Sequence, residues 1–122
     1  MRRLIVTFAV VALLGGLAAL GTSVAQSASS TKTVTLTDDV YTPKKLSIKK
    51  GTKVSWVWSS MNKDEHTVTQ ADKHYDPKDG GFGSKEQITG KTFSHKFKKT
   101  GTFYIVCEVH PTNMRMKVIV KR

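Results

Sequence analysis

The sequence is poor in cysteine, in proline and in acidic residues. It has one cysteine and three prolines among 122 residues, and the single Cys107 excludes a disulfide bond within the chain. The folded part must therefore rely on its own hydrophobic core, with or without the help of a bound metal. No segment places apolar residues convincingly at helical spacing, which disfavours a helical domain. The length suits one ordinary globular domain and excludes a second.

Acidic residues are outnumbered, with nine Asp and Glu against 20 Lys and Arg. All but two of the basic residues follow position 25, so residues 26–122 carry a net charge of +9. The basic residues are spread along the chain and no compact recognition motif accompanies them, so we expect no nucleic-acid partner. A cationic surface of this kind favours acidic or neutral protein partners, or an anionic membrane face.

The N-terminus has the pattern of an export signal. Two arginines precede an apolar run at 4–20, and small residues at Ser23 and Ala25 suit cleavage after Ala25. Residues 1–25 are therefore predicted to be a signal peptide. This places the mature protein in the periplasm or elsewhere outside the cytoplasmic membrane.

The apolar run leaves a second interpretation open. Its 17 residues exceed a typical signal core and approach the length that spans a bilayer, so an uncleaved N-terminal anchor is the alternative. Membrane association would follow in that case. Residues 26–32, rich in Ser and Thr, predict a flexible tether, and residues 33–122 form the expected domain.

Apolar and polar residues alternate in several short runs, as in strands that bury one face. Glycine and aspartate turn signals separate these runs, which lie at 34–36, 46–48, 54–58, 93–97, 103–107 and 116–120. Six or seven strands are predicted, packed as a β-sandwich or a closed barrel. Residues 70–89 are polar and rich in glycine, and they are predicted to form a long surface connection.

Chemically distinctive residues gather near the C-terminus. Cys107, His110 and Met114 offer a thiolate, an imidazole and a thioether within eight residues, and a turn after the strand ending at Cys107 can bring them toward one point. His66, at the start of another predicted strand, is the candidate fourth donor. Two histidines, one cysteine and a weakly bound methionine form the donor set of blue-copper electron-transfer sites.

Five segments, spread over essentially the whole predicted domain, carry a resemblance to a known family. The first is residues 41–56, with Tyr41-Thr42-Pro43 before a Gly51 turn and a Val-x-Trp strand. The others are His66-Thr67-Val68-Thr69, residues 82–84, residues 90–97 and residues 101–120 around the cysteine. In order and spacing the sequence resembles the cupredoxins, the type 1 blue copper proteins of the plastocyanin, amicyanin and pseudoazurin kind. The resemblance implies an all-β Greek-key β-sandwich of about seven or eight short strands that binds one copper ion.

The resemblance also implies the ligand set. His66, Cys107 and His110 would be the equatorial copper ligands, and Met114 the axial ligand. Met116 is the rival for the axial position, although it shares strand parity with the apolar residues that follow it and so favours a place in the core. Thr67 stands where many relatives carry an asparagine that braces the ligand loop.

The two remaining histidines are expected to have other roles. His95 alternates with Phe93 and Phe97, so it is predicted to be a partly buried structural residue. His74 lies in the polar connection and is predicted to lie at the surface.

Together these features predict a small exported copper protein that shuttles single electrons between redox partners through Cu(I) and Cu(II). By the resemblance, His110 would be the surface edge through which electrons pass. We expect a monomer that is not an enzyme and that docks redox proteins with an acidic or neutral surface. The alternative function is copper carriage, buffering or delivery in the periplasm without electron shuttling.

Overall fold

The structure is a computed structural model that describes Gly21 and residues 30–122. Apart from Gly21, the predicted signal peptide or anchor lies outside the described residues, as do residues 26–29. Within the described part there is no helix that could cross a membrane. Its regular elements are eight strands: β1 (Thr31–Thr37), β2 (Val40–Thr42), β3 (Lys45–Lys49), β4 (Lys53–Trp58), β5 (Thr69–Ala71), β6 (Thr92–Lys96), β7 (Gly101–Val106) and β8 (Arg115–Lys121).

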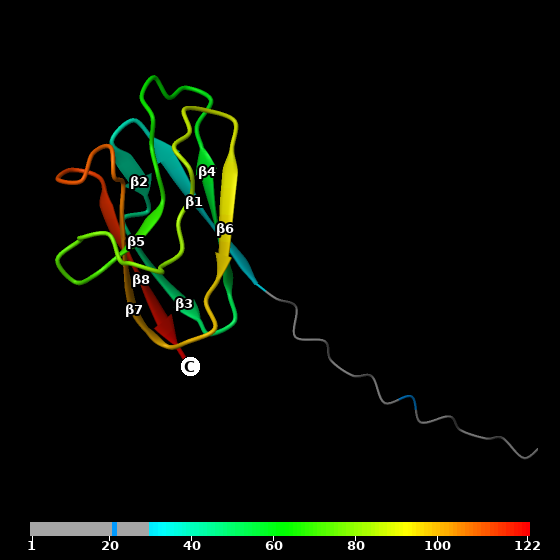
Figure 1. The fold of residues 1–122 in the computed structure, drawn as a ribbon. Coiled ribbons are helices and arrows are strands. Elements are labelled where there is room, and N and C mark those ends of the chain that lie inside the picture. Colours follow the sequence, from blue (N-terminus) through cyan, green and yellow to red (C-terminus); the bar gives the residue numbers. More distant parts are fainter. Residues whose placement is uncertain (1–20, 22–29) are drawn as a thin grey trace, which may run out of the picture.

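The strands form two four-stranded sheets that face each other as a β-sandwich (Figure 1). One sheet has the order β2-β1-β4-β6 and the other β3-β8-β7-β5. Both sheets are mixed, because β1 pairs in parallel with β4, and β3 pairs in parallel with β8. The predicted β-sandwich is confirmed.

Alternation explains why these segments are strands. In β4 the residues Val54, Trp56 and Trp58 are buried while their neighbours are half-buried or exposed. β8 repeats the pattern, so each strand turns one row of apolar side chains inward. The inner rows of the two sheets meet in one core around the fully buried Trp56.

The strands run between two ends of the sandwich. β7 begins at Gly101 and leads to Cys107, whereas β8 begins beside Met114 and returns to the opposite end at Lys121. β1 likewise ends beside Asp38 and β4 ends at Trp58. The loops after these strands form the end of the sandwich that carries the candidate ligands, called here the metal end.

The last two residues of the predicted tether, residues 26–32, are part of a strand. Thr31 and Lys32 belong to β1, because they pair in register with Lys53 and Val54 of the neighbouring parallel strand. Polar side chains made this segment resemble a linker. Backbone hydrogen bonding to β4 holds it in the sheet nonetheless.

The predicted surface connection at 70–89 is more structured than its composition indicates. Its first residues belong to β5, and isolated bridges join Gln87 to His66, Gly83 to Thr69 and Pro77 to Ala71. Phe82 packs against the core from this segment. The connection is therefore long but fixed to the sheet along its length.

Candidate metal centre

Three of the predicted donors meet at the metal end. The ligand atoms of His66, Cys107 and His110 all lie within 4.8 Å of one another. The Sγ atom of Cys107 is 3.8 Å from Nδ1 of His110, and the centres of the two imidazole rings are 5.1 Å apart. A residue that precedes β5 and a loop that follows β7 thus supply one cluster of nitrogen and sulfur donors.

His66 leaves one ring nitrogen free for a metal. The residue is fully buried, and its Nδ1 atom has no hydrogen-bond partner among the described residues. Its other nitrogen, Nε2, lies 3.0 Å from Oδ1 of Asp38. Because an ionised carboxylate can only accept, Nε2 carries the proton and Nδ1 presents a lone pair. A buried lone pair without a partner fits a metal ligand.

The carboxylate of Asp38 is held in place by the loop that leads to His66. It accepts hydrogen bonds from the backbone N–H groups of Lys63 and Asp64, at 3.0 and 3.2 Å. The hydrogen bond from His66, followed by those from the backbone, keeps the pKa of Asp38 below its usual range. Asp38 is therefore ionised at neutral pH and fixes both the orientation and the protonated nitrogen of the His66 ring.

A second carboxylate approaches the other histidine. Nε2 of His110 lies 3.1 Å from Oδ1 of Asp39 and 4.0 Å from Oδ2 of Asp64. Asp39 has a left-handed backbone with φ of 62°, a conformation that aspartate tolerates in tight turns. The two-residue turn between β1 and β2 thereby directs one aspartate toward each imidazole.

Cys107 is buried and braced by Thr67. The backbone N–H of Thr67 points to Sγ of Cys107 at 3.4 Å, and the Thr67 hydroxyl accepts a hydrogen bond from the N–H of Glu108 at 2.9 Å. Thr67 thus links the segment of His66 to the loop of Cys107. It braces the ligand loop at the position where many relatives carry an asparagine. An N–H group aimed at sulfur also stabilises a thiolate.

Tyr41 supports the same segment from the core. Its hydroxyl donates to the carbonyl oxygen of Thr67 at 2.6 Å. Burial, followed by the nearby Cys107 and Glu108, raises the pKa of Tyr41 far above its usual range, so the hydroxyl keeps its proton. The indole N–H of Trp58 donates to the carbonyl oxygen of His66 at 3.0 Å. Buried aromatic residues therefore hold the carbonyl groups of His66 and of the residue that follows it.

The ligand loop is closed on itself. Cys107 N–H donates to the carbonyl oxygen of Met114 at 3.0 Å, and Met114 N–H donates to that of His110 at 2.9 Å. Met114 is fully buried within this loop. These bonds bring the ends of the eight-residue segment together, as the spacing of its donors predicted.

The rival methionine has a different partner. Met116 is buried in the core, and its Sδ atom accepts a hydrogen bond from the indole N–H of Trp56 at 3.3 Å. A sulfur atom that already receives this bond has a structural role. The contact favours Met114 over Met116 as the axial ligand.

The other histidines lie outside the donor cluster. His95 is on β6, with its ring stacked on Phe82 at 3.9 Å between centres and edge-on to Phe97 at 4.8 Å. His74 is exposed, and its backbone N–H donates to Asp72. These positions agree with a structural role for His95 and a surface place for His74.

Sequence reasoning missed the three aspartates around the imidazoles. In the sequence Asp38 and Asp39 form only an aspartate turn signal, and nothing assigns a role to Asp64. Asp38 lies 28 residues from His66, and Asp39 lies 71 residues from His110, so no local spacing connects either aspartate to the histidine that it faces. The pairing of β1 with β2 and the loop before His66 bring them together.

The fold and the site together define a class: an all-β sandwich with a buried cysteine sulfur and two imidazoles at one end. The family model described as "Cupredoxin-like domain" matches residues 7–120. Since this match spans most of the chain, the protein belongs to the cupredoxin-like family. No match is found among the curated proteins.

Solved structures show the same fold. The chain is similar to a purple cupredoxin from Nitrosopumilus maritimus, with a TM-score of 0.66 and 23% identity over 74% of this chain and 99% of the other. A reduced amicyanin variant has a TM-score of 0.61 and 23% identity, covering 80% of this chain and 88% of that one. A copper-containing nitrite reductase from Thermus scotoductus has a TM-score of 0.62 and 23% identity over 75% of this chain, but this chain covers only 22% of that enzyme.

Proposed function

We propose that the protein is a small copper protein that transfers single electrons, with His66, Cys107 and His110 as equatorial ligands and Met114 as the axial ligand. The observation that carries the proposal is the cluster of three donor atoms within 4.8 Å, in which the buried Nδ1 of His66 has no hydrogen-bond partner among residues 30–122. Two imidazoles with a thiolate and a weak thioether are the donors of blue-copper sites. Bound copper would supply a one-electron couple between Cu(I) and Cu(II).

The protein's own residues restrain the site. Asp38 fixes the His66 ring, Thr67 links the two ligand segments, and the short loop closed by Met114 holds Cys107 and His110 at one end of a packed sandwich. Donors held this way change their positions little between oxidation states, which favours rapid electron exchange.

Electron transfer is favoured over copper carriage by the burial of the donors. His66, Cys107 and Met114 are fully buried, whereas the His110 side chain is 22% exposed. A carrier must let the ligands of an acceptor reach the metal, and three buried donors oppose that exchange. An electron needs only close approach to the exposed edge of His110.

We propose that redox partners dock at the metal end, around His110. Val109 and Pro111 are exposed on either side of it, while Asp39 and Asp64 lie beside its ring. The nearby carboxylates would repel an acidic surface. Of the two partner types predicted from net charge, the local charge therefore favours the neutral one.

We also propose, on sequence grounds, that the protein is exported and monomeric. We further propose that it is not an enzyme. The two arginines and the apolar run support export. The described residues offer one cluster with this nitrogen and sulfur donor set, whereas catalysis at copper generally needs an open coordination position or a second site.

The test separates electron transfer from carriage. Copper-loaded protein is cycled electrochemically, and the copper content is measured before and after, with and without a strong Cu(I) chelator. We expect reversible one-electron waves with copper retained through repeated cycles. Loss of copper to the chelator within the time of a few cycles, with no reversible wave, would support carriage instead.

A further inference from the structure

Half of the basic residues after position 25 collect at the end of the sandwich opposite the metal. This basic end consists of Lys32 and of residues 49–53, 96–99 and 121–122, which together contain nine exposed Lys and Arg side chains and no Asp or Glu. The segments are adjacent: Lys50 N–H donates to the carbonyl oxygen of Lys121, and Gly51 N–H to that of Phe97. Figure 1 shows the C-terminus at this end, away from the orange ligand loop.

These side chains do not serve the stability of the fold. Lys53 lies directly opposite Lys96 across the β4–β6 pair, and Lys49 is the register partner of Lys121. Among the described residues, no lysine or arginine nitrogen lies within 4.0 Å of a carboxylate oxygen; the ion pairs present involve histidines. Like charges on paired positions destabilise a sheet. Their accumulation without counter-charges points to an external anionic partner.

The carboxylates are distributed in the opposite way. Five of the nine acidic residues lie in the loops of the metal end, at positions 38, 39, 64, 65 and 108. The molecule therefore has a strong charge asymmetry along its strands. An anionic surface would attract one end and repel the other, and so would orient the domain.

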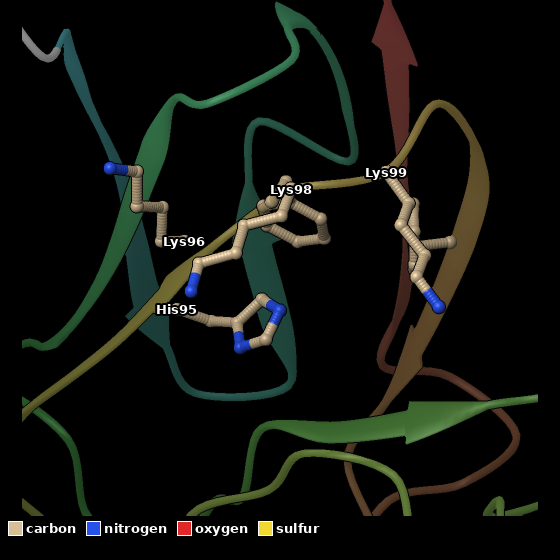
Figure 2. A pocket seen from close by; sticks show the side chains of 6 residues that line it. His95, Lys96, Lys98 and Lys99 are labelled. Atoms are coloured by element: carbon tan, nitrogen blue, oxygen red, sulfur yellow. The ribbon is translucent and has the colours of Figure 1, made fainter.

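The basic end also has an apolar recess. A groove there is lined by His95, Phe97 and Phe103 together with Lys96, Lys98 and Lys99. Figure 2 shows the histidine and the three lysines around it. Phe103 is half-buried there among exposed lysines, and such a combination suits the interface of a lipid bilayer, where anionic headgroups adjoin apolar chains.

We propose that the basic end binds the surface of an anionic lipid bilayer, so that the domain lies with its metal end facing away from the membrane. A bilayer is favoured over an acidic protein because the charge covers two strand connections, the start of β1 and the C-terminus instead of one pocket. The start of the domain also lies at the basic end, because Lys53 N–H donates to the carbonyl oxygen of Ser30 there. The apolar run at 4–20 would therefore join the domain from the membrane side if it remains as an anchor.

The proposal does not depend on copper, so it can be tested apart from the proposed function. Both sheets and the core lie within residues 30–122, which makes the chain from Gln26 onward the suitable form. Its binding is measured by sedimentation with vesicles of phosphatidylcholine alone and with vesicles that contain one third phosphatidylglycerol. We expect binding to the anionic vesicles only, weakening as salt is added.

Two triple variants with equal loss of charge locate the binding surface. Lys50→Gln, Lys98→Gln and Lys99→Gln alter the basic end, whereas Lys63→Gln, Lys85→Gln and Lys91→Gln alter lysines on loops elsewhere. At about fivefold per lysine near a charged membrane, the first set should weaken binding by roughly 100-fold, and the second by much less. Equal weakening by both sets would overturn the proposal, because it would show attraction by net charge alone. No binding to anionic vesicles at low salt, or binding to soluble polyglutamate but not to vesicles, would overturn it as well.

Discussion

At the scale of the residue, Asp38 connects the β1–β2 turn to the metal centre. Its carboxylate accepts hydrogen bonds from the His66 ring and from two backbone N–H groups in the loop that leads to His66. A carboxylate behind a histidine ligand fixes the ring and raises its basicity, and loss of such a partner typically lowers metal affinity 10- to 100-fold.

The substitution Asp38→Asn should therefore weaken Cu(II) binding by roughly 10- to 100-fold. It should also raise the reduction potential, because a negative charge near the metal favours Cu(II) over Cu(I). Competition with a chelator and voltammetry measure the two effects. Asp72→Asn is the control, since Asp72 accepts similar backbone bonds within its own loop. If both variants behave like the unchanged protein, Asp38 does not act on the site.

Thr67 offers a second test at this scale. Thr67→Val keeps the shape but removes the hydroxyl that accepts from Glu108 N–H, which should lower the free energy of unfolding of the metal-free protein by about 1–3 kcal/mol. Urea denaturation gives this value. Thr102→Val on the exposed face of β7 should change it by only about 0.5 kcal/mol, and an equal effect in both variants would count against the bracing role.

The donors themselves could be predicted because their chemistry is rare and their spacing is local. Cys107, His110 and Met114 lie within one loop, and few structural roles call for a lone thiol beside an imidazole. Asp38 and Asp39 could not be predicted as their partners. An aspartate pair between two alternating segments is typical of any turn, and only the register of the strands shows where it points.

At the scale of the element, β6 combines a histidine with the aromatic core. His95 stacks on Phe82 and meets Phe97 edge-on. Burial, followed by the nearby charge of Lys98, lowers the pKa of His95 from its ordinary value of 6.5. The unfolded chain therefore takes up this proton at a higher pH than the folded chain does, so acidification below about pH 6.5 favours unfolding.

We expect the free energy of unfolding of the metal-free protein to fall between neutral pH and about pH 5. His95→Phe keeps an aromatic ring in the stack and should make this fall smaller. His74→Gln, at an exposed position, should leave it unchanged. Denaturation at a series of pH values decides the matter, and an unaltered pH dependence in His95→Phe would show that the stack does not disfavour the charged ring.

Strands that bury a full row of apolar side chains could be predicted from the sequence. The short β2 could not, and β5 begins at Thr69, three residues after the strand start predicted at His66. β4 and β8 each bury three apolar residues in alternation, which leaves a clear pattern. β2 has three residues and buries only Tyr41, while β5 buries only Ala71. Their place in the sheets depends on backbone pairing with β1 and β7, and that pairing leaves almost no trace in composition.

At the scale of the whole molecule, the sandwich separates an end rich in carboxylates from an end rich in lysines, and it places the donors only at the first. The net charge predicted a uniformly basic protein. The arrangement of the strands instead gathers carboxylates at the metal end and lysines at the other. Composition cannot reveal this separation, because it depends on which turns share an end of the sandwich.

A metal that binds only the folded protein should stabilise the whole molecule. Copper at about 1,000 times its dissociation constant would add about 4 kcal/mol to the free energy of unfolding, with a matching rise in Tm. Thermal unfolding with and without copper measures the gain, and Cys107→Ser should lose most of it. A Tm that does not respond to copper would show that the cluster binds no copper in the folded state.

The central claim is that the Cys107 thiolate, together with His66 and His110, binds copper. Visible absorption of the Cu(II)-loaded protein tests it most directly, because among the proposed donors only the thiolate gives an intense Cu(II) band in this range. We predict a strong band that bleaches on reduction, returns on reoxidation and is absent in Cys107→Ser. A colourless or faintly coloured Cu(II) complex of the unchanged protein would contradict the account.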